Sequence, residues 1–282
     1  MAKKTINNLV VVGDTHIGDQ LALCPDVVRR RHGGTYRPSR FQKYIKSKWE
    51  QFWYEWVPKV TRGDEYALLF NGDMVEGRHH GAFHPITLDN SEQLDMAEEV
   101  LAPVVETAKG GLYYVSGTPA HAGEAGENEE ILAKRLGAIQ DEHGNYSRFE
   151  LFIRVGKALC HASHHIGTTG SMAYETTALT KEFNEFNAES ARWRRPFADI
   201  LIRSHRHRHS EVRIPTANGY GTIFVASAWQ LQTPWLFKTP GGRVSTPMIG
   251  GSLIRQGDEE FFTRHMTWET DRPKTETPRI EG

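Results

Sequence analysis

Short apolar runs of the length and residue type found in buried strands recur along the chain. Between the early runs, apolar residues return at helical spacing, which favours βαβ units and a sheet whose first strands are parallel. We predict strands at Leu9–Val12, Ala67–Phe70, Leu112–Val115, Phe149–Val155, Ala158–Cys160, Ile200–Ile202 and Thr222–Val225. From Asp199 onward, strand patterns dominate, including "EVRIP", "GTIFVAS" and "EEFFTRHMTW".

The longest helical pattern, Arg40–Val60, follows the start signal Pro38–Ser39. Its large apolar residues indicate a helix with an aromatic face toward the core, with stacking on nucleic-acid bases as the alternative. They are Phe41, Ile45, Trp49, Phe52, Trp56 and Val60. Further helices are predicted at Asn90–Lys109, bent at Pro103, and at Glu127–Leu136, whose acidic first turn suits the helix macrodipole, and Met172–Arg192.

The sequence predicts one domain followed by a tail. We see no internal repeat or flexible linker, so residues 1–269 are expected to form a single domain. Residues 270–282 hold two prolines and many charged residues, which predicts a flexible tail.

Composition narrows the classes of function. The formal net charge of -1 removes the overall positive field that drives non-specific nucleic-acid binding, although a local basic patch remains open. The two cysteines, Cys24 and Cys160, are too few for a disulfide framework, which favours a reducing compartment. The first apolar run stops at Gly13, too short for a signal peptide or a membrane span. We therefore expect a cytoplasmic protein without membrane contact.

The placement of the 14 histidines suggests metal binding. Three tight groups, "GRHHGAFH", "HASHH" and "SHRHRH", each lie beside a predicted strand. A single group is readily explained as a solvent-exposed loop, whereas three such groups favour shared ligation of a metal.

Four predicted strands end in residues that bind metals. They run into Gly13–His16, Asn71–Glu76, His164–His165 and Ser204–His207. In open α/β sheets, sites form beyond the carboxyl ends of strands, so these four groups can converge. In "VVVGDTHI", an extended chain would put Asp14 and His16 on the same side of the strand, with Gly13 allowing a tight turn.

The order of these motifs resembles that of the calcineurin-like metallophosphoesterases. Along residues 9 to 210 it is D-x-H, then G-D-x-x-E, then a lone histidine, then S-H-x-H. Each motif alone is weak, but all of them in order after strands is a strong signal. The resemblance implies an α/β fold, an α/β/β/α sandwich of two mixed β-sheets flanked by helices, with a binuclear metal site.

Carried over residue by residue, the resemblance assigns the ligands of both metals. Asp14, His16 and His207 would bind the first metal, and Asp73 would bridge the two metals. His205 and one of His164 and His165, with His164 preferred, would bind the second. The structural alternatives are a helix cap for Asp73 and, for His209, simply the next outward residue of its strand.

The third motif departs from the family. The family has Gly-Asn-His after this strand, whereas here Gly117 is followed by Thr118, Pro119, Ala120 and His121. Thr118 replaces the asparagine that ligates the second metal, and His121 lies two places later than the family's catalytic histidine. Three outcomes are open: weak ligation by Thr118, ligation of the second metal by His121, or a catalytic role for His121 with water completing the metal shell.

The implied chemistry is hydrolysis of a phosphoester. Two cations about 3.5–4 Å apart neutralise phosphate oxygens and hold a bridging hydroxide in line with the leaving group. The mixed nitrogen and oxygen ligands suit Mn first, with Zn, Fe or Ni as alternatives. Arg78, His79 and His80 follow the bridging motif and are candidates to contact the substrate, a solvated loop being the alternative.

The resemblance leaves the substrate open. Without a visible pair of arginines to clamp a dianionic monoester, we expect a phosphodiesterase acting on a nucleotide or nucleic acid. The alternatives are a phosphomonoesterase on the same site, or a catalytically impaired metal-binding scaffold. A metal-dependent amidohydrolase fits less well, because its H-x-H would come first. The arginines at 29–31, with Arg37 and Arg40, are candidates to line the substrate path.

Overall fold

Strand β1 (Asn8–Val12) is buried on both faces, and its alternate residues belong to different cores. Val10 and Val12 pack with residues of the helices, whereas Leu9 and Val11 pack with residues of a second sheet. This alternation shows that the strand lies inside a layered structure. The structure is a computed structural model that describes residues 5–79, 81–167, 172–217, 219–234, 236–238, 245–270 and 276–278.

Two five-stranded mixed sheets form the centre of the molecule. The first has the order β12-β11-β1-β4-β5, with β1, β4 and β5 parallel and β11 and β12 antiparallel. The second has the order β6-β7-β8-β10-β9, with β7, β8 and β10 parallel. The other strands are β4 (Ala67–Asn71), β5 (Leu112–Val115), β6 (Leu151–Val155), β7 (Ala158–Ala162), β8 (Ile200–Arg203), β9 (Ser210–Thr216), β10 (Gly219–Val225), β11 (Met248–Gln256) and β12 (Phe261–Glu269).

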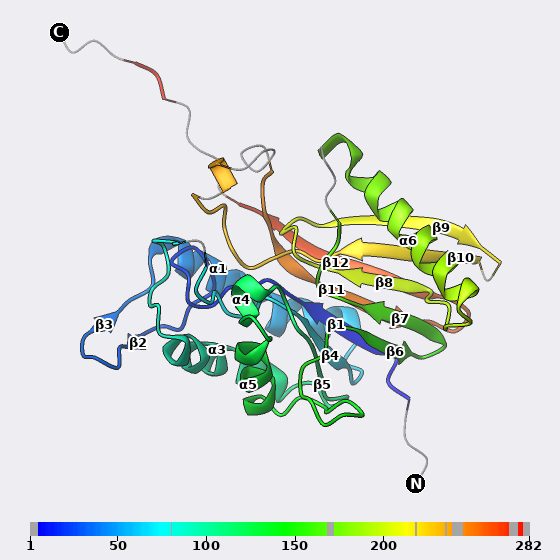
Figure 1. Cartoon of the computed structure of the whole chain (residues 1–282), viewed down its shortest axis with the longest axis horizontal. Helices are drawn as coiled ribbons and strands as arrows, with labels where there is room; N and C mark the ends of the chain where they lie inside the picture. Colours follow the sequence, from blue (N-terminus) through cyan, green and yellow to red (C-terminus); the bar gives the residue numbers. More distant parts are fainter. Residues whose placement is uncertain are drawn as a thin grey trace.

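Helices cover the outer face of each sheet (Figure 1). Helix α6 (Glu175–Arg192) packs on the second sheet through Leu179 and Phe183, and the remaining helices lie against the first sheet. These are α1 (Arg40–Gln51), a π-helical segment (Phe52–Trp56), α2 (Val57–Thr61), α3 (Asn90–Val105), α4 (Pro119–Ala122) and α5 (Glu127–Arg135). Short 3-10 turns occupy Met172–Tyr174 and Leu236–Lys238, and a small hairpin joins β2 (Val28–Arg29) to β3 (Thr35–Tyr36). The predicted α/β/β/α arrangement is confirmed.

Several element boundaries differ from the prediction. The strand expected from Phe149 begins at Leu151, and Phe149 is 73% exposed. Along 40–60 the helix is nearly continuous and its tryptophans do pack in the core, but Phe41 is 42% exposed. Helix α3 ends at Val105, soon after Pro103, which lies in its last turn.

Strand β11 was missed because its sequence contains Gly250 and Gly251, which weaken a strand pattern. Both glycines are required by close packing. A Cβ at Gly250 would meet the Met266 carbonyl oxygen at 1.8 Å, and one at Gly251 would meet the Phe52 ring at 2.6 Å.

The parallel strands of both sheets bring their carboxyl-end loops to one region. The loops after β1, β4 and β5 leave the first sheet at the same edge, and those after β7 and β8 leave the second. Backbone hydrogen bonds join neighbouring loops within each sheet, from Asp14 N to Gly72 O at 2.9 Å in the first and from Ser204 N to His164 O at 2.9 Å in the second. Across the sheets, His205 N donates to Asp14 Oδ1 at 3.2 Å. The predicted convergence of the motif-bearing loops therefore occurs.

Among the described residues, no helix is both long and apolar enough to cross a membrane. At the start of the predicted tail, Thr270 is buried and its hydroxyl donates to the Pro247 carbonyl oxygen at 3.4 Å. Residues 276–278 are exposed, and the rest of 271–282 lies outside the described residues.

Candidate metal centre

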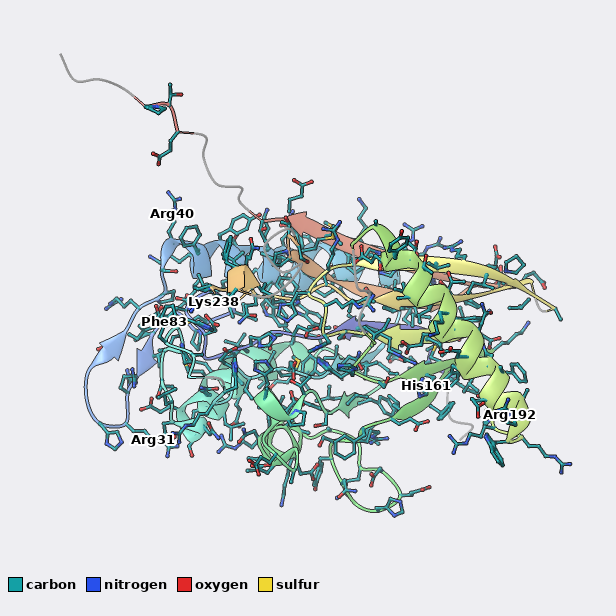
Figure 2. The ribbon with its side chains drawn as sticks, turned by 45° about the horizontal axis from the view of Figure 1, so that its top comes forward. Arg31, Arg40, Phe83, His161, Arg192 and Lys238 are labelled. Atoms are coloured by element: carbon teal, nitrogen blue, oxygen red, sulfur yellow. The ribbon has the colours of Figure 1, made fainter. Side chains whose placement is uncertain are left out.

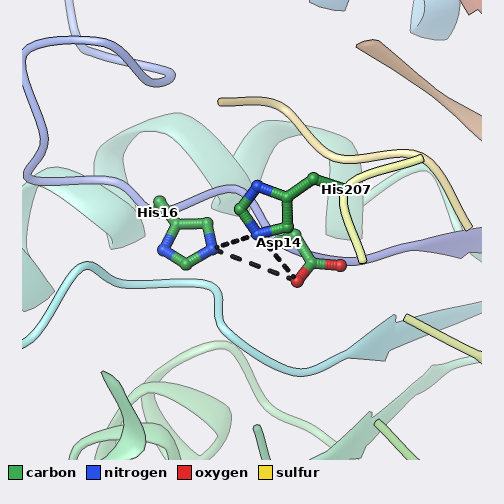
Figure 3. A group of neighbouring side chains, drawn as sticks. All are labelled: Asp14, His16 and His207. Atoms are coloured by element: carbon green, nitrogen blue, oxygen red, sulfur yellow. Dashed lines mark hydrogen bonds and ion pairs between the residues drawn. The ribbon is translucent and has the colours of Figure 1, made fainter. Parts of the chain in front are cut away.

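Asp14, His16 and His207 form a first cluster, drawn in Figure 3. The Nε2 atoms of His16 and His207 are 3.0 Å apart, and His207 Nε2 lies 3.4 Å from Asp14 Oδ1. His16 Nδ1 donates to a Glu76 carboxylate oxygen at 3.0 Å, so the ring in its neutral form would carry its lone pair on Nε2, the atom that faces His207. Two imidazole nitrogens and a carboxylate oxygen thus face one point, a donor set that fits a divalent transition metal.

Asp73, His164 and His205 form a second cluster. His164 Nδ1 donates to the Asn71 carbonyl oxygen at 2.6 Å, which directs Nε2 to Asp73 Oδ2 at 3.0 Å. This Nε2 also lies 3.9 Å from Asp14 Oδ1, a residue of the first cluster. His205 is exposed, whereas Asp73 and His164 are buried. The two clusters are therefore adjacent, as a binuclear site requires.

Five of these six residues have left-handed backbones. Their φ angles are 51° for Asp14, 44° for His16, 53° for Asp73, 74° for His205 and 55° for His207. Only two other described residues besides glycine have positive φ, Arg62 and Arg194. Left-handed φ costs a non-glycine residue about 1–3 kcal/mol, and such residues cluster at functional sites. The extended conformation predicted for Asp14 and His16 is therefore wrong, because β1 ends at Val12 and the loop itself aims the side chains.

Three glycines allow the loops to approach closely. A Cβ at Gly117 would lie 2.0 Å from Asp73 Oδ1, and one at Gly72 would lie 2.4 Å from His164 Nδ1. Gly13 was predicted to permit a turn, but it is absent from the glycines with positive φ. Its requirement is space, since a Cβ there would meet Ser204 Oγ at 2.8 Å.

A buried polar network supports the first cluster. Glu76 bonds His16 through Oε2 and lies 2.8 Å from His79 Nε2 through Oε1. Gln230 Nε2 donates to Glu76 Oε2 at 3.3 Å and to Asp19 Oδ2 at 2.8 Å. A carboxylate behind a ligating histidine fixes its tautomer and orientation. The sequence motif contains Glu76, but nothing in it assigned this role. The buried Asp19, three residues after His16, was missed altogether.

Carboxylates set the protonation of the clustered histidines. Burial lowers the pKa of His16, but the hydrogen bond and charge of Glu76 outweigh it and raise that pKa to about 9. Burial likewise opposes the charge of Asp73 on His164, whose pKa is raised to about 10. Nearby His164 holds the Asp14 and Asp73 pKa values below their usual range despite burial. The site therefore collects protons that a metal would displace.

Thr118, the residue in place of the family's asparagine, contacts Asp73 directly. Its backbone N–H donates to Asp73 Oδ1 at 2.7 Å, and its hydroxyl lies 3.2 Å from both carboxylate oxygens. Glu129 is completely buried and accepts the backbone N–H of Met74 at 2.8 Å and that of Gly117. This carboxylate joins the Asp73 loop to the Thr118 loop. Glu129 lies in the first turn of α5, and from the sequence the acidic residues of this turn were predicted only to complement the helix macrodipole.

His121 lies on the side of the first cluster. Its ring meets the His16 ring edge-on at 4.4 Å between centroids, and it groups with His16 and Glu76. Its Nδ1 donates to the Glu76 carbonyl oxygen at 2.5 Å, so Nε2 carries the lone pair. Burial lowers the His121 pKa to about 4. The structure thus presents His121 as a neutral acceptor beside the first cluster.

The remaining candidates are farther from the ligand atoms. His165 is exposed, and its ring is 4.7 Å from that of His205. His79 packs against the His121 ring at 4.4 Å, Arg78 is exposed, and His80 lies outside the described residues. His161, from the same "HASHH" group, instead lies beneath α6 against Phe186 (Figure 2). Only His164 of that group joins a metal-binding cluster.

No protein-family model and no curated protein sequence matches the chain. Solved structures that resemble it include a Vps29 double mutant from Entamoeba histolytica, at 12% identity and TM-score 0.37, covering 93% of this chain and 99% of that one. Vacuolar protein sorting 29 from Cryptosporidium parvum has 12% identity, TM-score 0.36 and coverages of 95% and 100%. A metallophosphoesterase from Sphaerobacter thermophilus has 9% identity, TM-score 0.41 and coverages of 94% and 89%. Identities this low transfer no activity to this chain.

The observed layers and the two clusters agree with the motif-based resemblance. The chain has two five-stranded mixed sheets within helical layers, and buried histidines and aspartates meet at the strand ends. This is the fold and the candidate metal centre that a calcineurin-like metallophosphoesterase requires.

Proposed function

We propose that the chain is a binuclear metal-dependent phosphoesterase, and that its preferred substrates are phosphodiesters. The observation that carries the proposal is the meeting of two ligand clusters from four loops, with His16 Nε2 and His207 Nε2 only 3.0 Å apart. Neutral imidazoles with their lone pairs directed at each other repel, unless a cation or a proton lies between them.

Asp14, His16 and His207 would hold the first metal, and Asp73, His164 and His205 the second. Asp73 is the candidate bridging ligand by the motif resemblance. The second cluster lies beside the first, since His164 Nε2 is 3.0 Å from Asp73 Oδ2 and 3.9 Å from Asp14 Oδ1. When bound, two transition-metal ions would neutralise the phosphoester oxygens and acidify the attacking water. Mn is the ion we test first, since carboxylate and imidazole donors together suit it, and Zn, Fe and Ni are alternatives.

The chain's own residues have separate tasks in this proposal. Glu76 holds the His16 ring in the tautomer with a free Nε2, and Glu129 fixes the loops of Asp73 and Thr118. His121, neutral near pH 7 because burial lowers its pKa to about 4, would accept a hydrogen bond from the hydroxyl group of the departing alcohol. Arg78 and His79 lie after the bridging motif and are candidates to contact the substrate.

One structural feature favours a diester of nucleotide type, in addition to the lack in the sequence of a visible pair of arginines to clamp a dianionic monoester. The β2–β3 hairpin is a structured insertion with exposed Arg29 and Arg37, and Arg40 begins α1 at the same end of the molecule (Figure 2). Arginines placed this way suit phosphate contacts.

Hydrolysis of bis-p-nitrophenyl phosphate by the metal-stripped chain with added Mn²⁺ tests the proposal. We expect Mn²⁺-dependent turnover that Asp73→Asn lowers by about 10³-fold or more, because both metals lose a ligand. Asp26→Asn, at an exposed ion pair with Lys46, is the control and should keep full activity. Faster hydrolysis of p-nitrophenyl phosphate would reassign the chain as a monoesterase.

A metal-binding scaffold is the second candidate, and Thr118 favours it. Its hydroxyl contacts the Asp73 carboxylate where the family has an amide ligand. Stoichiometric metal binding with no turnover of either ester would support this candidate and exclude the enzyme.

A further inference from the structure

A third group of metal-binding side chains lies away from the centre described above. His209, Glu211 and His265 each offer one ligand atom, and these three atoms all lie within 4.8 Å of one another. The rings of His209 and His265 are 4.0 Å apart and tilted by 31°, and His265 Nε2 is 3.4 Å from Glu211 Oε2. His209 is the third histidine of "SHRHRH", and the first two belong to the metal centre.

Each of the three side chains forms a further hydrogen bond through an atom other than its candidate ligand atom. His209 Nδ1 donates to the Val225 carbonyl oxygen at 3.0 Å, so its Nε2 keeps the lone pair. His265 Nδ1 lies 2.8 Å from the Ser252 hydroxyl, which leaves Nε2 toward the glutamate. Second partners of this kind orient the ligands of protein metal sites.

Glu211 is held in the same manner. Its Oε1 accepts the hydroxyl of Thr222 at 3.0 Å and also that of Thr263, while its Oε2 faces His265. Arg213 Nε lies 3.8 Å from Oε1, whereas His265 lies nearest to Oε2. The three side chains are half-buried, so an ion can reach them from solvent.

The cluster joins the two sheets at one edge. Glu211 belongs to β9, the outermost strand of the second sheet, and His265 belongs to β12, the outermost strand of the first. The Thr263 hydroxyl bond to Glu211 connects the same two edge strands, and Tyr220 of the neighbouring strand β10 donates to the Phe261 carbonyl oxygen of β12. A metal here would therefore link strands that are not neighbours in any sheet.

We propose that His209, Glu211 and His265 form a separate site for one divalent transition-metal ion, with Zn²⁺ the best match. Two imidazoles and one carboxylate, with a fourth position left for water, are a common zinc ligand set. The site would bind its ion independently of the phosphoesterase centre and stabilise the contact between β9 and β12.

Metal counting on the full chain tests the proposal. After removal of all metal, the protein is loaded with excess Zn²⁺, desalted and analysed by mass spectrometry of the metal. Glu211→Gln and His265→Gln should each lose one equivalent per chain relative to the parent, and neither should lose more. His143→Gln, which changes an exposed histidine outside every cluster, is the matched control and should lose none.

Failure here is distinguishable from failure of the phosphoesterase proposal. Asp73→Asn should lose metal from the main centre but keep the equivalent that depends on Glu211. A stoichiometry unchanged in both Glu211→Gln and His265→Gln would overturn the third site, whatever the activity of the chain. In the parent, Zn²⁺ should also raise the melting temperature by an increment that both variants lack.

If both variants fail to fold, the parent itself gives the answer. Crystals grown with Zn²⁺ should show an anomalous peak at the zinc edge between the two imidazoles and Glu211. Anomalous peaks at Asp14 and Asp73 without a peak between His209, Glu211 and His265 would reject the site. Thr263→Val removes only the supporting hydroxyl and should weaken Zn²⁺ binding at this site by about 10-fold.

Discussion

The two halves of the candidate metal centre differ in what lies behind them. In the first half, a buried network of Glu76, Gln230 and Asp19 holds the His16 ring. In the second half, the backbone and Thr118 contact Asp73 and His164, Glu129 holds the surrounding loops, and His205 is exposed.

The difference predicts unequal metal affinities. The first half holds His16 through a charged side chain in a buried setting, where such hydrogen bonds are strong. The second half has Thr118 at the position of the family's amide ligand, and its His205 is exposed. We therefore expect the first metal to stay bound on dilution and the second to exchange with the solution.

Alanine at the two histidines of "SHRHRH" that join the metal centre is the strongest test of this inequality. His207→Ala should lower phosphodiesterase activity by about 10³-fold at any Mn²⁺ concentration, because the tight half loses a ligand. His205→Ala should lose less, and saturating Mn²⁺ should restore part of the activity. Equal, unrecoverable losses would show that the halves are equivalent.

Glu76→Gln tests the network itself. The amide keeps the size of the side chain but removes the charge that orients His16, so the affinity of the first metal should fall about 10- to 100-fold. Isothermal titration with Mn²⁺ measures it. Glu92→Gln is the matched control for loss of a buried charge and should leave metal affinity unchanged. Glu92 is a buried residue of α3 that pairs with Arg30.

Thr118→Asn should strengthen the weaker half. An amide oxygen beside Asp73 would add the ligand that the third motif lacks, and we expect the Mn²⁺ concentration needed for half-maximal activity to fall about 3- to 10-fold. Thr118→Val separates the alternatives. If removing the hydroxyl alone lowers that concentration equally, Thr118 acts by competing for the Asp73 oxygens rather than by failing to ligate.

We expect the smallest of these effects in the pH dependence of the melting temperature. In the metal-free chain the pKa values of His16 and His164 are raised from 6.5 to about 9 and about 10. The stabilisation from their protonated forms is complete below pH 6.5 and is lost as the pH rises through those values. With chelator present, the melting temperature should fall by a few degrees between pH 6.5 and 9, and bound Mn²⁺ should remove that fall.

Single histidine variants divide this effect between the halves. His16→Gln should flatten the decline up to pH 9, while the part due to His164 should persist toward pH 10. A melting temperature that does not depend on pH in the metal-free parent would contradict the assigned protonation of both histidines.

The sequence predicted the layers and the six clustered residues because both depend on local patterns. Strand residues such as Leu9 and Val10 are apolar in an unbroken run, and Asp14, Asp73 and His207 follow strands directly. Parallel strands then bring these loops together without any information about distant contacts.

What supports the site could not be predicted in this way. Glu129 belongs to a helix whose first turn is acidic for an ordinary electrostatic reason, and its contact with Gly117 depends on how α5 docks. Gly250 and Gly251 interrupt a strand pattern because of partners in β12 and the π-helical segment. Such roles are set by tertiary contacts, which residue spacing does not encode.

The left-handed ligands imply a conflict between durability and function. At Asp14, His16, Asp73, His205 and His207, glycine would adopt the observed backbone at no steric cost. Selection of this protein for thermal resistance alone, in the absence of metal, should therefore favour glycine or asparagine at these positions. The variants that survive heat best without metal would then be among those least able to bind it, so the ligand loops mark where this chain gives up stability.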